Sequence, residues 1–275
     1  MRLLNKTFII TEFGKPFSWT QQYINNVQHL QKDGWNWKIF TPNKYEAKGN
    51  VEVINMRAEQ FNNLVKRKLD VKPNLFITEQ GIPSVHVTDF YIFSGVIFED
   101  YLKGVDFWGI TNMDVVYGNL SKYVTDELLS DCMVFSDDVN TINGVFSLFK
   151  NIDAINGLFR DIENWAMILG QPPCPGCLGK GEHKLCGSDE YLMTNLLREN
   201  KYIRFKYPTY YPMLSHDRLE QHVPTPKLAR KDNGSLWELF NDINGPEWEH
   251  ARPVIGKEIP YFHFQRTKSW PSIQS

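Results

Sequence analysis

The stretch Asp106-Phe-Trp-Gly-Ile-Thr-Asn-Met-Asp-Val-Val-Tyr-Gly-Asn119 decides how this chain is interpreted. The apolar residues Val105, Phe107, Trp108 and Ile110 are typical of a strand that is covered on both faces. Asp114 follows at the end of that strand, and in an open α/β sheet ligands bind at the carboxyl ends of the strands. A carboxylate there can hold a divalent cation against a diphosphate. The alternative is that Asp114 only caps a turn, where Asp is common.

Two segments around this stretch resemble a family of small glycosyltransferase-like proteins of surface-polysaccharide synthesis. Residues 98–109 are similar to the family's segment that leads from a helix into the strand before the metal motif. Residues 113–120 are similar to the segment with which the chain leaves that motif. The resemblance reaches from the first strand to His263. It implies the GT-A fold of nucleotide-diphospho-sugar transferases, an α/β fold whose mostly parallel, Rossmann-like sheet is flanked by helices. It also implies a single domain over residues 1–275, with a Cys-, Gly- and Pro-rich loop at 171–187.

The same resemblance implies an enzyme, a hexosyl- or pentosyltransferase. Such an enzyme moves a sugar from a nucleotide diphosphate sugar to a hydroxyl of a glycan or glycolipid. The family's metal motif is Asp-x-Asp, and its second Asp, kept here as Asp114, is the more direct ligand of Mn²⁺ or Mg²⁺. Asn112 replaces the first Asp. Its amide can hydrogen-bond a ribose or a metal-bound water but adds no charge, so we expect a weaker metal site than in the family.

The aromatic segment Tyr261-Phe-His-Phe-Gln265 resembles the family's terminal strand, where a histidine completes the metal site. The resemblance therefore implies His263 as a ligand beside Asp114, with the phosphates supplying further ligands. Arg266 and Lys268 follow and can pair with diphosphate oxygens. The residues alone leave other interpretations open, because a His between aromatic residues is commonly a core residue and cations at a strand end are commonly solvated.

The segment from Gly187 to Asn195 looks like the acidic helix start that GT-A enzymes place opposite the donor sugar. A carboxylate there can deprotonate the attacking acceptor hydroxyl as a general base, or stabilise positive charge on the sugar in retaining relatives. Asp189 is the preferred candidate and Glu190 the second. The alternative is helix capping, because acidic residues favour the first turn of any helix.

Three of the four cysteines fall within a short loop, as Cys174, Cys177 and Cys186 together with His183; only Cys132 lies elsewhere. The spacing C-x₂-C-x₅-H-x₂-C is typical of ligands of a tetrahedral Zn²⁺. A structural zinc would stiffen the loop just before the acidic helix start. A disulfide and free thiols remain as alternatives.

The resemblance places the nucleobase of the donor against the loop that leaves the first strand. Thr11, Glu12 and Phe13 occupy that loop. Asp89, in the helix before the metal motif, resembles an Asp of the family's "D-[YF]" signature. These residues could equally be an ordinary loop and an acidic residue at a helix start.

Composition limits the classes of protein that remain. The chain has 275 residues, of which 42% are hydrophobic, so it can bury a sizeable core. A net charge of −2 argues against a nucleic-acid-binding protein. The apolar run near the N-terminus is too short for a signal peptide, and no run is long enough to cross a membrane. We expect a cytoplasmic protein, with the membrane surface as a second place of action.

The hydrophobic pattern predicts a strand–helix–strand start, which is typical of a parallel sheet. Later segments predict more strands, a helix that Ser188 caps and a hairpin turn at Asp232-Asn-Gly234. We expect strands at 6–11, 36–40, 51–54, 105–111 and 259–265, a pair of strands within 132–149, and helices at 19–31, 58–69, about 88–101 and 152–169.

Two other classes of protein compete with the transferase. One is a relative that binds nucleotides or glycans without catalysis, in which Asn112 marks the loss of the metal motif. The other is an interaction protein with a zinc knuckle on an α/β scaffold. Metal-dependent hydrolysis of a nucleotide sugar would separate the enzyme from both.

Overall fold

The structure is a computed structural model, and it describes most of the first 200 residues together with short segments of the remainder. The described residues are 2–71, 90–137, 142–170, 188–200, 205–206, 227–230, 235–241, 253–254, 258–259, 261–263 and 273–274. The statements below concern these residues.

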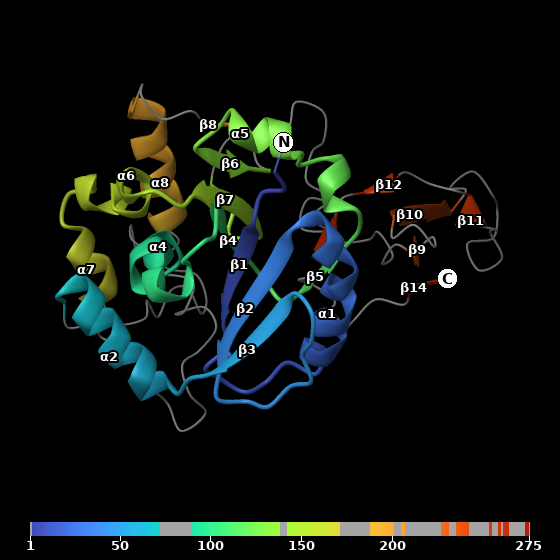
Figure 1. The fold of residues 1–275 in the computed structure, drawn as a ribbon, viewed down its shortest axis with the longest axis horizontal. Coiled ribbons are helices and arrows are strands. Elements are labelled where there is room, and N and C mark those ends of the chain that lie inside the picture. The colour runs from blue at the N-terminus through green and yellow to red at the C-terminus, as the bar shows by residue number, and fades with distance from the viewer. Residues whose placement is uncertain are drawn as a thin grey trace.

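A seven-stranded sheet forms the centre of the molecule, in the order β3-β2-β1-β4-β7-β6-β8 (Figure 1). All neighbouring strands are parallel except at β7, which is antiparallel to both β4 and β6. This topology confirms the predicted fold class, α/β with a mostly parallel sheet flanked by helices. The strands are β1 (Lys6–Thr11), β2 (Trp35–Thr41), β3 (Val51–Asn55), β4 (Phe107–Thr111), β6 (Val134–Ser136), β7 (Phe146–Lys150) and β8 (Phe205–Lys206).

The order of the strands reverses next to β1. The chain runs from β1 to β2 and β3 on one side, and then returns to place β4 on the other side of β1. The register pairs Lys6 with Phe107 and Ile9 with Ile110, so the carboxyl ends of β1 and β4 lie side by side. In open α/β sheets this switch point is where ligands bind.

Helices cover both faces of the sheet, as Figure 1 shows for α1 on one side and α2, α4 and α8 on the other. Two separate hydrophobic clusters fill the spaces between the helices and the sheet. Phe8 and Ile10 of β1 belong to the cluster that contains α1, whereas Ile9 belongs to the cluster that contains α2, α4 and α8. This alternation follows from the period of two along a strand, and it explains why β1 is apolar on both faces.

The helices are short apart from two. The longest are α2 (Ala58–Leu69) and α8 (Ser188–Glu199). The others are α1 (Thr20–Val27), α4 (Ser94–Ile97), α5 (Asp126–Ser130), α6 (Asp153–Asn156) and α7 (Trp165–Gly170), with 3₁₀ turns η1 (Gln28–Asp33), η2 (Tyr91–Phe93), η3 (Glu99–Tyr101), η4 (Leu120–Lys122) and η5 (Leu158–Asp161).

Two small sheets stand beside the main one. β5 (Val115–Tyr117) pairs in antiparallel fashion with β13 (Tyr261–His263). The second small sheet, at the right of Figure 1, contains β9 (Lys227–Arg230), β10 (Leu236–Asn241), β11 (Pro253–Val254), β12 (Glu258–Ile259) and β14 (Ile273–Gln274). β9 and β10 are antiparallel, as the predicted hairpin requires.

Two of the predicted helices are broken into pieces. The region 152–169 forms α6, η5 and α7, because Gly157 caps α6 and starts a 3₁₀ turn. The region 90–101 forms η2, α4 and η3, and Gly95 lies so close to the core that a Cβ there would come within 2.8 Å of Trp108 Nε1. Close packing thus replaces the regular helix that the periodicity predicts.

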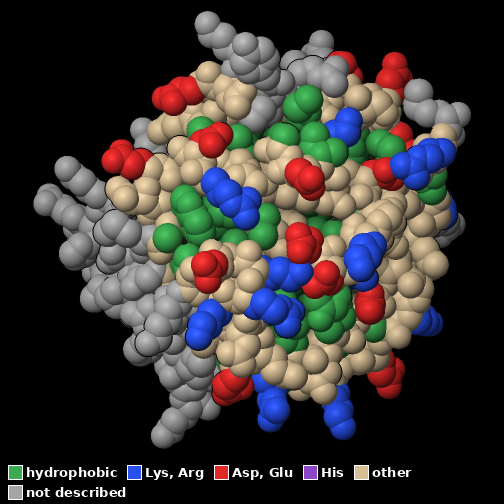
Figure 2. Space-filling view, turned by 60° about the vertical axis from the view of Figure 1, so that its left-hand side comes forward, with side chains coloured by type: hydrophobic (Ala, Val, Ile, Leu, Met, Phe, Trp, Pro, Cys, Tyr) green, Lys and Arg blue, Asp and Glu red, His purple; other side chains and the backbone are tan. Residues whose placement is uncertain are grey.

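The surface carries both signs of charge. Figure 2 shows acidic and basic side chains mixed over one face, with hydrophobic side chains between them. No single sign of charge dominates this face, in keeping with a net charge of −2. Within the described segments, no helix has the length and apolar composition that a membrane span requires.

Candidate functional site

The candidate site lies at the carboxyl edge of the main sheet, at the switch point between β1 and β4. β4 ends at Thr111 and is followed by Asn112, Met113 and Asp114. Met113 is buried on the α1 side of the sheet, where its Sδ lies 3.7 Å from Thr20 Oγ1. Asn112 and Asp114, on either side of it, are half-buried. The buried methionine therefore anchors a short segment that carries two polar side chains at the end of the strand.

A tyrosine from η2 fixes the position of Asn112. The hydroxyl of Tyr91 donates a hydrogen bond of 3.2 Å to Asn112 Oδ1. Sequence reasoning did not single out Tyr91, because its role depends on a contact between segments 21 residues apart. With the amide oxygen engaged by Tyr91, the amide N–H groups of Asn112 are the part that can donate to an oxygen of a ligand.

Asp114 lies between β4 and β5. The strand that pairs with β5 is β13, and it brings the backbone of His263 close to Asp114. The register of β5 with β13 places His263 opposite Val115, the residue after Asp114. Two segments about 150 residues apart thus meet at the end of β4. The structure therefore brings the backbone of one predicted metal ligand next to the other.

The pKa of Tyr117 reflects the negative charges near the end of β4. Burial raises the pKa of Tyr117, and the negative charges of Asp137 and Asp114 raise the pKa further. Its hydroxyl, which shares a hydrogen bond with Thr111, is therefore protonated at neutral pH. Asp137 follows β6 at the same edge of the sheet and is 8% exposed. Sequence reasoning missed Asp137, although an acidic residue directly after a buried strand is the same signal that singled out Asp114.

The start of α8 is held against the carboxyl edge through Glu190. The backbone N–H of Gly144, just before β7, donates a hydrogen bond of 2.7 Å to Glu190 Oε1. Thr194 on the next turn of α8 accepts a 2.8 Å hydrogen bond from the backbone N–H of Ile142. Asp189 lies in the first turn of the same helix. Its backbone is thereby brought to the candidate site, while its side chain is outside what the structure describes.

The three residues predicted to contact the nucleobase, at the end of β1 and just after it, differ in their surroundings. Thr11 is half-buried at the end of the strand. Phe13 is 3% exposed and stacks on Phe61 of α2 at 4.8 Å between ring centroids, so it is a core residue. Glu12 is 5% exposed, and its carboxylate accepts five hydrogen bonds from protein groups.

Several predicted site residues lie outside the described residues, and their predictions stay as they were made. They are Asp89, Cys174, Cys177, His183, Cys186, Arg266 and Lys268. Among the residues that the structure does describe, no group of three His, Cys, Asp or Glu side chains is placed to hold a metal ion.

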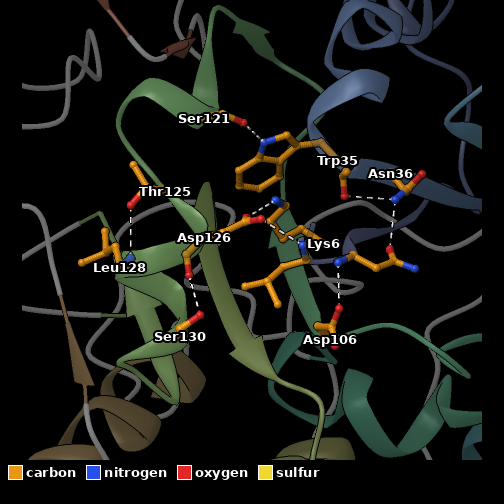
Figure 3. Close-up of polar contacts among 12 residues, drawn as sticks. Lys6, Trp35, Asn36, Asp106, Ser121, Thr125, Asp126, Leu128 and Ser130 are labelled. Atoms are coloured by element: carbon orange, nitrogen blue, oxygen red, sulfur yellow. Dashed lines mark hydrogen bonds and ion pairs between the residues drawn. The ribbon is translucent and has the colours of Figure 1, made fainter. Parts of the chain in front are cut away.

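The opposite, amino-terminal edge of the sheet is closed by a structural network (Figure 3). Lys6 is 1% exposed, and its Nζ lies 2.6 Å from Asp126 Oδ1 and 5.1 Å from the ring centroid of Trp35. Asp126 also accepts the backbone N–H of Leu4 at 2.9 Å. Charge at this edge is therefore paired within the protein and serves the fold.

These features define the class of protein: an α/β domain whose polar and acidic side chains gather at the carboxyl edge of a mostly parallel sheet, where the strand order reverses. The chain belongs to the Family of unknown function (DUF6625), whose model matches residues 8–274. No curated protein matches the sequence.

The solved structures with some similarity include glycosyltransferases. GlyE of Streptococcus pneumoniae TIGR4 has 9% identity and a TM-score of 0.35, and the match covers 75% of this chain and 45% of GlyE. The galactosyltransferase LgtC, solved with donor and acceptor sugar analogues, has 9% identity and a TM-score of 0.33, with 60% and 65% covered. An active-site mutant of LgtC has 11% identity and a TM-score of 0.33, with 60% and 64% covered. The chain spans less than two thirds of each of these proteins, and at such scores their activities do not carry over to it.

Proposed function

We propose that this protein is a glycosyltransferase of polysaccharide synthesis. It moves a hexosyl or pentosyl group from a nucleotide diphosphate sugar to a hydroxyl of a glycan or lipid-linked glycan. The bond between the anomeric carbon and the diphosphate oxygen breaks, and a bond between that carbon and the acceptor oxygen forms. The acceptor's proton passes to a carboxylate, and the nucleoside diphosphate leaves.

One observation carries the proposal: Asn112 and Asp114 directly follow the end of β4, beside the end of β1, at the switch point of the sheet. A crevice at this position is the usual ligand site of open α/β sheets. An amide donor and a carboxylate suit a polar, anionic ligand that comes with a divalent cation. At the amino-terminal edge, by contrast, the buried cation of Lys6 and the carboxylate of Asp126 are paired with each other.

The residues present fit a hard divalent cation at this edge. Asp114 supplies a half-buried carboxylate, and β13 supplies His263 one register position away. We assign these two residues as the protein ligands of Mn²⁺ or Mg²⁺, with the donor's phosphates as further ligands. Such a cation stabilises the negative charge that develops on the leaving diphosphate.

The remaining roles rest on the sequence resemblance, and for Asn112 and Asp189 also on the contacts described above. The amide of Asn112 donates a hydrogen bond to an oxygen of the nucleotide sugar. Asp189, in the first turn of α8, takes the proton of the acceptor hydroxyl. Arg266 and Lys268 pair with the diphosphate, and the loop with Cys174 and Cys177 holds a structural zinc. We further propose that the protein acts in the cytoplasm or at the membrane surface.

The first experiment is a thermal-shift panel of nucleoside diphosphates with and without Mn²⁺. We expect at least one of them to raise Tm only when the metal is present. Nucleotide sugars of that base are then tested for metal-dependent hydrolysis and transfer. If no nucleoside diphosphate gives a metal-dependent shift, the proposal is wrong. Binding without hydrolysis or transfer would instead identify a non-catalytic binding protein.

A further inference from the structure

Glu12 is a buried carboxylate whose bonding capacity is fully used by the protein. Its Oε1 accepts from Thr20 Oγ1 at 2.8 Å and from the backbone N–H of Phe17 at 3.4 Å. Its Oε2 accepts from the hydroxyl of Tyr45 at 2.6 Å, and from Thr41 Oγ1 and Asn43 Nδ2, both at 3.2 Å. Two carboxylate oxygens offer about four lone-pair positions, so five donors leave none for a ribose or a base.

The charge of Glu12 has no cationic partner among the ion pairs of the described residues. A buried charge without a counter-ion is tolerated only when it is well hydrogen-bonded. The network around Glu12 meets that condition. Burial raises the pKa of Tyr45, and its hydrogen bond to Glu12 and the charge of Glu12 raise the pKa further, so the tyrosine stays a donor.

Three of the five donors come from the two loops that border the carboxyl end of β1, while Thr20 begins α1 and Thr41 ends β2. Phe17 lies in the loop between β1 and α1, while Asn43 and Tyr45 lie in the loop after β2. The second loop is also tied to α1, because the side chain of Gln21 bonds both the backbone N–H and the carbonyl of Glu46, at 3.1 and 2.8 Å. Glu12 is therefore the point at which both loops are joined to the sheet.

The same network reaches the segment that carries Asn112 and Asp114. The hydroxyl that Thr20 donates to Glu12 lies 3.7 Å from Sδ of Met113. Thr20 is completely buried and Met113 is 5% exposed, so this contact is part of the packed interior. A displacement of Glu12 would therefore displace residues on both sides of the switch point: the two loops on one side and the segment of Asp114 on the other.

We propose that Glu12 is a positioning residue of the nucleotide site: its carboxylate fixes the loops 13–19 and 42–46 and, through Thr20 and Met113, the segment of Asp114, without touching the ligand. This inference rests on the proposed function, and it assigns Glu12 a different role from the direct donor contact that the sequence suggests.

The test compares variants that remove one part of the network at a time. Glu12→Gln keeps the shape but places an amide among donors, whereas Tyr45→Phe and Thr20→Val each remove one hydroxyl. Glu52→Gln is the control, because that side chain is 59% exposed and pairs with Lys38 on the sheet surface. Affinity for the nucleoside diphosphate with Mn²⁺ is measured by calorimetry well below the Tm of every variant.

We expect Tyr45→Phe and Thr20→Val each to weaken binding about fivefold, because the roughly 1 kcal/mol of the lost hydrogen bond must then be supplied on binding to order the loops. Glu12→Gln should weaken it by more, and Glu52→Gln should not change it. Unchanged affinity in Tyr45→Phe and Thr20→Val would overturn the proposal. It would leave either direct contact by Glu12, if Glu12→Gln alone loses binding, or a purely structural role, if only Tm falls.

Hydrogen exchange of the free protein separates this inference from the proposed function. In Tyr45→Phe we expect faster amide exchange in both loops, with the strands unchanged. Exchange identical to the wild type would overturn the positioning role even if nucleotides bind. Failure of the wild type to bind any nucleoside diphosphate would overturn the proposed function, and with it the link between Glu12 and a nucleotide.

Discussion

The hydroxyl of Tyr91 donates a 3.2 Å hydrogen bond to Asn112 Oδ1 and so fixes the side chain two residues before Asp114. A carboxylate at position 112 could accept the same hydrogen bond. Aspartate or asparagine at position 112 therefore gives the site a different charge, while the hydrogen bond from Tyr91 can hold either side chain in the same place. This separates a charge effect from a positional one in experiments.

The first prediction concerns that charge. Asn112→Asp should raise the affinity for Mn²⁺ about tenfold, because a second negative charge close to the cation adds roughly 1.4 kcal/mol of attraction in a half-exposed site. Tyr91→Phe is the control, since it removes the hydrogen bond without altering charge and should change metal affinity less. Calorimetry with Mn²⁺ measures both. An affinity that falls or stays the same in Asn112→Asp would mean that residue 112 points away from the metal.

The second prediction concerns the proposed metal ligand. Asp114→Ala should abolish the Mn²⁺-dependent binding of the nucleoside diphosphate and leave the fold intact, because the side chain is half-buried at the edge of the sheet. Asp131→Ala removes an exposed carboxylate just before β6, at the opposite edge, and should leave binding unchanged. Unchanged metal-dependent affinity in Asp114→Ala would exclude Asp114 as a ligand.

The third prediction concerns the network at the amino-terminal edge (Figure 3). Asp126→Ala leaves the ammonium of Lys6, 1% exposed, without its partner and should lower the free energy of unfolding by about 3–5 kcal/mol. Glu52→Ala breaks the more exposed pair with Lys38 and should cost at most about 1 kcal/mol. Urea unfolding compares the two. Equal losses would show that the Lys6–Asp126 pair is no more important than a surface pair.

The main sheet could be predicted closely because its strands are covered on both faces. The predicted strand at 6–11 agrees with β1, and the predicted helix at 58–69 agrees with α2. A continuous apolar run or a clear helical period is enough for such elements. The helix predicted at 19–31 gives way after Val27 to the 3₁₀ turn η1, which ends at Gly34 with φ of 77°. That change depends on how the turn packs, and periodicity does not carry this information.

The candidate site could be predicted only in part. Asp114 was singled out by a local signal, a carboxylate at the end of a buried strand. The roles of Tyr91 and Gly144 depend on partners 21 and 46 residues away in the sequence, and Glu12 joins partners from 5 to 33 residues away, so no local pattern indicates these roles. Local chemistry identifies a ligand candidate, whereas the groups that position it become visible only once the chain has folded.

The fourth prediction concerns the cysteine loop, which lies outside the described residues. Metal analysis of freshly purified protein should find close to one Zn²⁺ per chain, and Cys177→Ser should remove it. Cys132→Ser is the control, because Cys132 is buried and lies far from that loop in the sequence. Absence of zinc together with a mass lower by two protons would indicate a disulfide instead.

The last prediction concerns the acceptor proton, for which Asp189 and Glu190 compete. Glu190 Oε1 accepts the backbone N–H of Gly144 at 2.7 Å, and a Cβ on Gly144 would come within 2.4 Å of that oxygen. Glu190 is thus fitted to the backbone before β7, a role that the carbonyl oxygen of Gln can also fill. We therefore expect Glu190→Gln to have a mild effect on turnover.

Asp189→Asn, by contrast, should lower kcat by about 10²-fold or more, because a positioned general base contributes that much. Donor affinity should stay nearly intact, since the proton moves only in the transition state. Steady-state transfer to a model acceptor, with donor binding measured separately, checks both variants. Near-normal turnover in Asp189→Asn would remove Asp189 from the mechanism. A large loss in Glu190→Gln at unchanged Tm would give the base to Glu190, and its hydrogen bond with Gly144 would then be what orients it.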